Sequence, residues 1–465
     1  MDKTLALVNR NDTIAAAATG PAGGAVALVR LSGPQAVTIA GRFLRGKQGA
    51  EFPPAPRTAV LMRVQEGEEL LDRAVVVFFR APASYTGDDV FEISCHGSPY
   101  ITARVLGAAL KNGARAAEPG EFSMRAFLNG KLDLAQAEGL CDLILSKNAA
   151  AHKAALSMTE GKVSDGFKTI KDDIVALLAE TEARIDDADD EIPPLDRFMA
   201  GNLFNAARAR TKRLAGTFEL GKLMKNGIAV AIAGAPNAGK SSLLNALAGC
   251  DRAIVAPTPG TTRDTIEQSV DLEGFRLILT DTAGLRSHAL DPAELEGMRR
   301  TEAAIKKADF AIIVCSAETG FTETDRTVLK LVSDAGKPFI VALNKTDLAD
   351  TENAAAKLAG AETVCISCKT LAGIEALKSA LIKTLPLDDL DENSAVVTSA
   401  RHYACLLAAE TELARAETLL LADPAPFELA AVHLNAALRE LEGAVGDTAA
   451  DEILGAVFSR FCVGK

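Results

Sequence analysis

The stretch GAPNAGKSS occupies residues 234–242, directly after the apolar run IAVAIA at residues 228–233. It fits the pattern G-x-x-x-x-G-K-[ST], which binds phosphate when it joins a strand to a helix. Glycines let successive backbone N–H groups face a phosphate, and the N-terminus of the following helix adds partial positive charge. A chance glycine-rich turn could match the letters alone. The strand–loop–helix setting makes that interpretation the weaker one, so the stretch predicts a phosphate-binding loop.

The polar side chains of this loop have distinct expected roles. Lys240 can reach the β- and γ-phosphates of a nucleotide, and Ser241 can offer its hydroxyl to Mg²⁺. The nucleotide-binding residues expected from this loop are Asn237, Ala238, Gly239, Lys240, Ser241 and Ser242.

Two later stretches predict which base the nucleotide carries. NKTD, residues 344–347, follows the apolar run FIVAL, and SCK, residues 367–369, lies at the end of the next predicted strand. The carboxylate of Asp347 can accept two hydrogen bonds from guanine, whereas adenine would present an acceptor and leave that carboxylate unpaired. Together with DTAG at residues 281–284 and with Thr262, these stretches predict GTP. The expected contacts are Asn344, Lys345, Asp347, Ser367, Cys368 and Lys369, with Asp281, Thr282, Ala283 and Gly284.

The residues for hydrolysis are less standard. Many small GTPases have a glutamine after the DTAG glycine to orient the attacking water. This chain has Leu285 there, which cannot hydrogen-bond water. Glu294 is a candidate for that role, although a surface glutamate is an equally simple interpretation. No arginine finger is obvious, and Asn237 with the loop APTPGTTRD, residues 256–264, could supply oxygen ligands for a monovalent cation instead.

The chain shows three different patterns of apolar and polar residues, which predict a multidomain protein. Residues 1–118 alternate short apolar runs with glycine- and proline-rich turns, a pattern typical of an α+β domain. Residues 119–226 and 386–465 have helical periodicity. Between them, residues 227–385 alternate apolar strands with helices, which indicates a parallel sheet wrapped by helices. We therefore expect an all-α helical domain in two halves, interrupted by an α/β P-loop GTPase domain.

Composition limits the classes of function. The 465 residues carry a net charge of −12, which argues against a surface coated with basic groups for nucleic acid. The densest basic segment is Arg208, Arg210, Lys212, Arg213, Lys222 and Lys225, and a solvated helix face is its simplest interpretation. No window reaches the ~18 uninterrupted apolar residues of a membrane span. With scattered cysteines typical of a reducing compartment, we expect a cytoplasmic protein. Cys365 and Cys368 have metal half-site spacing, but no second pair completes a zinc site.

The chain ends in FCVGK, residues 461–465, and two interpretations compete for this tail. A prenylation signal has a cysteine, two aliphatic residues and a specificity residue, but Gly464 and Lys465 fit that pattern poorly. A thiolate at Cys462 beside the ammonium of Lys465 is a plausible reactive group, since a nearby positive charge lowers the pKa of cysteine. The sequence favours tail chemistry over a lipid.

Long stretches of the sequence resemble the bacterial tRNA-modification GTPase family MnmE, also called TrmE. GAPNAGKSSLLNAL, PGTTRD, DTAGLR and the terminal FCVGK resemble its G domain and its C-terminus. DTIAAAATGPAGGAVALVRLSG and YTGDDVFEISCHGSPYI are similar to its N-terminal domain, and PGEFSMRAFLNGKLDLAQAEGLCDLI to the start of its helical domain. The resemblance runs the full length of the chain, which makes it far more specific than the phosphate loop alone.

The resemblance implies a function and partners. It implies an N-terminal domain that binds 5-formyl-tetrahydrofolate or a related tetrahydrofolate and drives homodimerisation. With a flavoprotein, MnmG, in an expected heterotetramer, the chain would add a carboxymethylaminomethyl or aminomethyl group at C5 of the wobble uridine of certain tRNAs. Hydrolysis of GTP would need K⁺ as well as Mg²⁺, and no membrane would be involved.

The resemblance also assigns roles to individual residues. K⁺ would be held by Asn237, Thr261 and the backbones of Ala256 and Thr258. Mg²⁺ would be held by Ser241 and Thr262, and Glu294 would align the attacking water. The loop residues expected around the nucleotide are Ala256, Pro257, Thr258, Pro259, Gly260, Thr261 and Thr262. Tetrahydrofolate would contact Arg30, Glu92, Lys131 and Lys465. Cys462 is the candidate reactive group, and two roles stay open for it: it forms a covalent intermediate, or it is simply placed beside the folate.

Two alternatives remain open. The segment after DTAG is about a residue longer than the family pattern and contains Pro292, so Glu296 competes with Glu294 for the water-aligning role. A regulatory GTPase of the ribosome-assembly kind, without modification chemistry, would carry a similar G domain. The folate-type N-terminal domain and the terminal Cys-Val-Gly-Lys favour the tRNA-modifying enzyme over this regulatory GTPase. A third interpretation, a prenylated membrane GTPase, requires a prenylation signal at the C-terminus, and FCVGK fits that signal poorly.

Overall fold

The computed structural model describes residues 11–48, 51–186, 193–250, 267–281, 293–349, 362–384, 395–448 and 450–464. The chain forms two compact units. One contains residues 1–141, 158–212 and 404–465, and the other contains residues 142–157 and 213–403. The predicted multidomain class, with α+β, all-α and α/β P-loop parts, is confirmed. The four finer domain ranges stay predictions.

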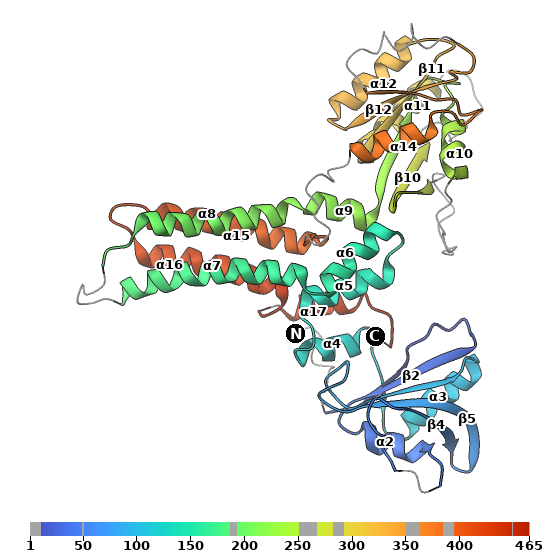
Figure 1. Cartoon of the computed structure of the whole chain (residues 1–465), viewed down its shortest axis with the longest axis vertical. Coiled ribbons are helices and arrows are strands. Elements are labelled where there is room, and N and C mark those ends of the chain that lie inside the picture. Colours follow the sequence, from blue (N-terminus) through green and yellow to red (C-terminus); the bar gives the residue numbers. More distant parts are fainter. Residues whose placement is uncertain are drawn as a thin grey trace. The chain divides into compact units, whose positions relative to one another are not determined.

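The first unit contains a seven-stranded sheet with the strand order β3-β4-β5-β6-β2-β1-β7. Its strands are β1 (Ile14–Ala17), β2 (Val26–Ser32), β3 (Leu44–Arg45), β4 (Ala59–Glu66), β5 (Glu69–Phe79), β6 (Val90–His96) and β7 (Arg115–Ala116). Neighbouring strands are antiparallel, except that β1 and β7 are parallel. The helices α2 (Ala36–Phe43) and α3 (Pro99–Lys111) pack against one face (Figure 1).

Side-chain alternation determines which residues of this sheet meet the two helices. Val29 and Leu31 of β2 are fully buried in the core that includes α2 and α3, as are Val76 and Phe78 of β5. Successive side chains in a strand point to opposite faces, so Arg30, between Val29 and Leu31, belongs to the other face. Arg30 of β2 and Glu92, its partner on β6, therefore share the face that α2 and α3 leave uncovered.

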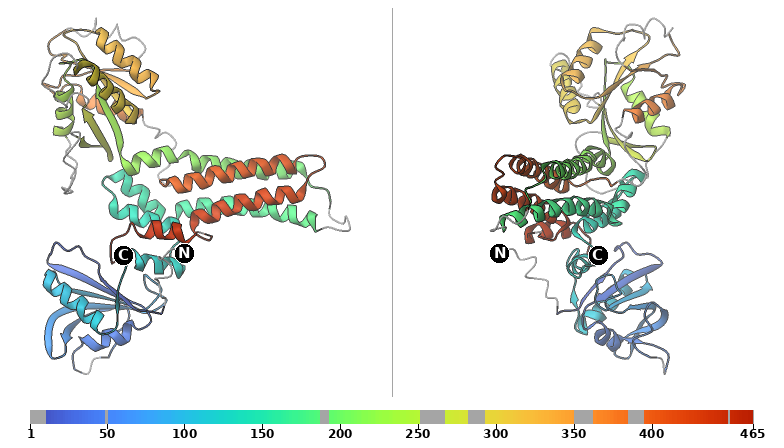
Figure 2. Two further views of the ribbon diagram at one scale, coloured as in Figure 1. Left: turned by 180° about the vertical axis from the view of Figure 1, so that it is seen from behind. Right: turned by 60° about the vertical axis from the view of Figure 1, so that its left-hand side comes forward.

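Helices make up the rest of the first unit and continue into the second (Figure 2). They are α4 (Glu121–Leu128), α5 (Leu134–Leu145), α6 (Ala149–Thr159), α7 (Lys162–Ile185), α8 (Arg197–Gly216), α9 (Phe218–Asn226), α15 (Ala400–Leu420), α16 (Phe427–Val445) and α17 (Asp451–Phe458). Among the described helices, α7 and α16 pack against each other most extensively. Ile170, Ile174 and Leu177 form the buried stripe of α7, at the helical spacing expected for a core-facing side. Among the described residues, no helix combines the length and apolar character that a membrane crossing requires.

Three side chains of the densest basic segment form ion pairs with other helices, although Lys212, on the predicted solvated face, keeps 61% of its side chain exposed. On α8, Arg208 bonds Glu410 at 2.7 Å and Glu417 at 2.5 Å, and Lys212 lies 3.3 Å from Glu410. Arg210 forms an ion pair with Asp173 of α7. These three positive charges are therefore engaged in ion pairs between helices.

The second unit contains a six-stranded sheet with the strand order β13-β12-β11-β8-β10-β9. Its strands are β8 (Ile228–Ala233), β9 (Glu267–Leu272), β10 (Phe275–Asp281), β11 (Phe310–Ser316), β12 (Phe339–Asn344) and β13 (Thr363–Cys365). Its helices are α10 (Lys240–Cys250), α11 (Ala293–Lys307), α12 (Glu323–Asp334) and α14 (Ile374–Lys383). All neighbouring strands are parallel except β9, which runs antiparallel to β10. The sheet has a core on each face, so its central strands are buried on both sides, and their carboxyl ends open at one edge.

The opposite end of the β9–β10 hairpin contacts helices of the same unit. The amide of Ala150, at the start of α6, donates to the carbonyl of Gly274 at 2.9 Å. Phe275 packs against a small cluster that includes Leu220 and Met224 of α9. The hairpin thus links α6 and α9 to the strand that leads into the DTAG stretch.

A close backbone crossing also fixes α9. Gly221 lies so near the segment 395–399 that an added Cβ would stand 2.1 Å from the carbonyl oxygen of Val397. The amide of Val397 donates to Thr217 Oγ1 at 3.0 Å, which holds this segment against the helix.

We expect Gly221→Ala to destabilise the second unit, because overpacking of this kind typically costs about 1–3 kcal/mol. Gly216→Ala is the matched control, since no atom lies within 4 Å of its added methyl group and alanine favours the helix. Calorimetry of the full chain should show a lower unfolding midpoint for the first variant only. Equal midpoints for the two variants would show that the crossing tolerates a side chain.

Candidate functional site

The predicted phosphate loop connects β8 to α10, and two of its glycines are required by close backbone contacts. Gly234 has φ +149°, and an added Cβ would lie 2.1 Å from the carbonyl oxygen of Val314. Gly239 has φ +102°, and its added Cβ would lie 2.1 Å from Asn344 Nδ2. Asn237 is held at φ +60°, a conformation that asparagine adopts more readily than most residues. The loop therefore keeps its shape only with these residue types.

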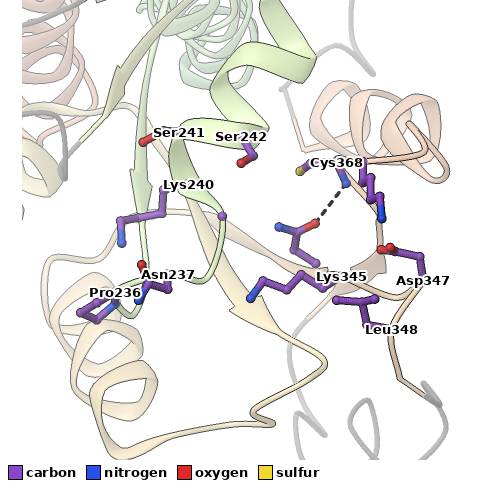
Figure 3. Close-up of a pocket in the computed structure, with 12 residues that line it drawn as sticks. Pro236, Asn237, Lys240, Ser241, Ser242, Lys345, Asp347, Leu348 and Cys368 are labelled. Atoms are coloured by element: carbon purple, nitrogen blue, oxygen red, sulfur yellow. Dashed lines mark hydrogen bonds between the residues drawn. The ribbon is translucent and has the colours of Figure 1, made fainter.

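A cavity of about 650 Å³ opens beside this loop (Figure 3). Its lining residues are Pro236, Asn237, Gly239, Lys240, Ser241, Ser242, Asn344, Lys345, Asp347, Leu348, Cys368 and Lys369. Lys240 is only 8% exposed, and its ammonium donates to the carbonyls of Gly234 and Ala235 at 2.9 and 2.8 Å. The loop thus places a fixed positive charge beside the start of a helix, a setting that suits phosphate. The cavity combines residues of the phosphate loop with the two stretches predicted to read the base.

Hydrogen bonds join these two parts of the cavity. Asn344 Nδ2 donates to the carbonyl of Ala238 at 2.9 Å, and the amide of Cys368 donates to Asn344 Oδ1 at 3.1 Å (Figure 3). Ser367 Oγ donates to Asp347 Oδ1 at 2.7 Å. One carboxylate oxygen of Asp347 is therefore held by the protein, which sets the orientation that a base would meet. Ala238 is buried and contributes its carbonyl, whereas Ser367 acts through Asp347.

The thiol of Cys368 is not a candidate nucleophile. Burial, and next the negative charge of Asp347, raise its pKa to about 11. The thiolate, which is the reactive form, is scarce at neutral pH for such a group. Cys368 therefore contributes its backbone amide and its shape to the cavity wall.

Asp325 supports the phosphate loop and was missed by sequence reasoning. It is 1% exposed, and its Oδ1 accepts from the amide of Ala235 at 3.3 Å. Its Oδ2 accepts from the amide and the hydroxyl of Thr322, in a capping box that starts α12. The T-x-x-D spacing in TETD predicts the helix start. It carries no signal for the contact with the loop, because the loop lies 90 positions away in the chain.

Several predicted site residues lie outside the described residues. They are Ala256, Pro257, Thr258, Pro259, Gly260, Thr261, Thr262, Thr282, Ala283, Gly284 and Lys465. Asp281 ends β10, and Glu294 and Glu296 lie in the first turn of α11, but the side chains of all three also lie outside the described residues. The roles of these residues stay predictions.

A second group of predicted residues meets on the N-terminal sheet. Arg30 bonds Glu92 Oε1 through Nε at 3.1 Å and through Nη2 at 2.7 Å. Its Nη1 donates to the carbonyl of Gly464 at 3.3 Å, although the two residues are 434 positions apart. Cys462 is exposed nearby in the chain, and Lys131 is exposed in the turn after α4. The structure thus joins Arg30, Glu92 and the tail, and it shows no described bond from the Lys131 side chain to them.

Comparisons with known proteins match the whole chain. The family model described as "MnmE helical domain" matches residues 134–462, and the one described as "GTP-binding protein TrmE N-terminus" matches residues 13–131. The tRNA modification GTPase MnmE of Christiangramia forsetii is 37% identical over 475 residues, covering 98% of this chain and 99% of that protein. Its counterpart in Nitrosomonas europaea is 39% identical over 458 residues, with coverage of 98% and 99%. Among solved structures, Era of Aquifex aeolicus bound to GDP and AlF4⁻ is 26% identical with a TM-score of 0.28, covering 40% of this chain and 66% of that chain.

We expect Ser367→Ala to weaken binding of guanosine nucleotides about 10-fold, because the lost bond no longer orients the carboxylate of Asp347. Thr384→Ala is the control, since that hydroxyl bonds only the Leu381 carbonyl at 2.6 Å among the contacts described for it. Titration with a fluorescent GDP analogue measures both affinities. Unchanged affinity in Ser367→Ala would mean that Asp347 does not need this bond to read the base.

Proposed function

The chain belongs to the MnmE family of tRNA-modification GTPases, and from this premise we propose that it is a K⁺-dependent GTPase that modifies the wobble uridine of certain tRNAs. With the flavoprotein MnmG, in the cytoplasm, it adds a carboxymethylaminomethyl or aminomethyl group at C5, with a tetrahydrofolate as one-carbon donor. The observation that carries this proposal is the tail on the N-terminal sheet, where Gly464 meets Arg30. The alternative of a purely regulatory GTPase assigns no role to Cys462 or to this contact of Gly464 with Arg30.

The nucleotide cavity supports the GTPase part of the proposal. Lys240 exchanges its two loop carbonyls for the β- and γ-phosphates, and Ser241 offers its hydroxyl to Mg²⁺. Asp347, held by Ser367, accepts hydrogen bonds from guanine. The cavity fits a nucleoside triphosphate, because a buried ammonium and a helix start lie at one end of it and a carboxylate at the other (Figure 3).

A monovalent cation accounts for the missing arginine finger. Asn237 lines the phosphate end of the cavity and has an amide oxygen, a ligand type that hard cations prefer. We assign K⁺ to Asn237, Thr261 and the backbones of Ala256 and Thr258, and Mg²⁺ to Ser241 and Thr262. A bound cation there supplies positive charge next to the developing negative charge of the leaving group. Glu294 in α11, directly after the DTAG segment, holds the water in place of the absent glutamine.

The N-terminal sheet supports homodimerisation. On the face away from α2 and α3, Leu61 of β4 lies opposite Val75 of β5, and these side chains are 60% and 42% exposed. Adjacent exposed apolar side chains on an open sheet face are typical of an interface. Arg30 and Glu92 belong to the same face, so a dimer formed there would place the proposed tetrahydrofolate contacts beside the partner chain.

We expect GTP hydrolysis to be faster in K⁺ than in Na⁺ at equal ionic strength, by about 10-fold or more, because the proposed cation, K⁺, would stabilise the negative charge that develops on the leaving group. Glu294→Ala should lower the K⁺-stimulated rate by about 100-fold, while Glu296→Ala should leave it within a factor of about two. Phosphate release from the purified full chain measures all four rates. Equal rates in the two salts would refute the cation, and a large loss only in Glu296→Ala would move the water-aligning role to that residue.

A charge on the exposed sheet face should separate the dimer. We expect Val75→Asp to convert the protein to a monomer, because a buried unpaired carboxylate in an interface is strongly unfavourable. Leu429→Asp, at a side chain of α16 that is 57% exposed, is the matched control and should stay dimeric. Light scattering coupled to size exclusion gives the mass of each variant. Dimeric Val75→Asp would place the interface elsewhere.

A further inference from the structure

Residues 461–464, called the tail here, lie against β1 and the start of α4. Phe461 is buried with Phe458 in a core beside α4, which anchors the start of the tail. Val463 forms a β-bridge with Pro119, and the amide of Gly120 donates to the carbonyl of Cys462 at 3.5 Å. The tail is therefore docked by the buried side chain of Phe461 before the cysteine and by backbone contacts at Cys462 and Val463.

Gly464 can lie this close to β1 only because it has no side chain. Its φ is +98°, and an added Cβ would stand 2.4 Å from the carbonyl oxygen of Ala17 on β1. The residue is buried, whereas Cys462 and Val463 are exposed. This close approach brings the Gly464 carbonyl within 3.3 Å of Arg30 Nη1.

Arg30 is held rigidly by groups that surround its guanidinium. Two of its nitrogens bond one oxygen of Glu92, and a third bonds Gly464. Its Cζ lies 5.5 Å from the ring centre of Tyr85 and 5.6 Å from that of Phe122, distances suited to cation–π contact. Tyr85 is itself fixed by a hydrogen bond of 2.7 Å to Ser123. With only 14% of its side chain exposed, Arg30 presents little more than its remaining N–H edge to any ligand.

We propose that Arg30, oriented by Glu92, is a latch that holds the C-terminal tail through the Gly464 carbonyl and so positions the thiol of Cys462. Arg30 is in this sense a positioning residue for the tail, in addition to any contact with tetrahydrofolate. The inference rests on the proposed function, since it concerns the group that the tail brings to that reaction. Lysine cannot replace arginine here, because a single ammonium cannot bond Glu92 and Gly464 in the same fixed geometry.

The test follows a trifluoromethyl label on Cys462 by fluorine NMR in the full-length protein. Cys365→Ser removes the other exposed thiol among the described cysteines, and the Cys462 resonance is the one lost in Cys462→Ser. In the parent protein the resonance should differ from that of the labelled peptide FCVGK. In Gly464→Ala and in Arg30→Lys it should shift from the parent position toward that of the peptide, while Glu92→Gln, which keeps an Oε1 acceptor, should retain the parent position.

Gly130→Ala is the matched control for Gly464→Ala. It has a similar positive φ of +66°, but no atom lies within 4 Å of its added Cβ. Hydrogen exchange of β2 and β6 confirms that each variant keeps its sheet. With the sheet intact, a parent-like resonance in both Arg30→Lys and Gly464→Ala would overturn the latch.

Turnover gives a second readout. With MnmG and tRNA, the rate of uridine modification should fall on the order of tenfold to a hundredfold in Gly464→Ala and in Arg30→Lys. Misplacing a reacting group by about 1 Å can slow a reaction by a factor of this size. Turnover at the parent rate with a peptide-like resonance would also overturn the proposal, since the thiol would then act without being positioned. GTP hydrolysis in K⁺ is measured separately and tests the proposed function, so the two failures are distinguishable.

Discussion

The side-chain amide of Asn344 joins the two halves of the nucleotide cavity, and much of the site depends on it. It is buried, and both of its ends are satisfied by backbone groups, the carbonyl of Ala238 and the amide of Cys368. Buried polar groups nearly always have such partners, because an unpaired one costs about 1–3 kcal/mol. The same amide stands where a Cβ on Gly239 would lie, so the glycine and the asparagine require each other. The spacing between the phosphate loop and the base-reading loop is thereby fixed before any nucleotide binds.

The sheet that carries this cavity is also attached to helices at its other end. β10 ends at Asp281, where the DTAG stretch begins, and it starts at the turn of Glu273 and Gly274. That turn accepts a hydrogen bond from the first turn of α6, and Phe275 packs against α9. Within this unit, β10 connects these helices to Asp281, where the predicted DTAG contacts with the nucleotide begin.

The sequence predicted the parts of the site that are local in the chain and missed those made by distant contacts. The phosphate loop, NKTD and SCK are short stretches with fixed spacing, and the structure places them around one cavity. β9 was not predicted, because EQSVDL alternates weakly and has few apolar residues. Arg208 forms ion pairs with Glu410 and Glu417, which lie more than 200 positions away in the chain. The basic run in the sequence therefore gave no sign that this arginine contacts acidic residues of another helix. The bond between Arg30 and Gly464 has no signal in either stretch alone.

The tail rests on a rigid base, which explains how so short a segment can hold a position. Beneath it, α4 begins at Glu121, directly after its N-cap Gly120, and carries Phe122 and Arg125. Arg125 bonds Asp12 at 2.5 Å and Glu121 at 2.9 Å, and both Arg125 and Glu121 are almost fully buried. Replacing a buried ion pair with apolar residues is often neutral or stabilising, so such a network is better explained by the geometry it fixes than by stability. Here it fixes α4 to the segment before β1, and α4 in turn supplies the Phe122 ring beside Arg30 and the backbone turn that meets Cys462. The buried charges thus hold in place the surface on which the tail docks.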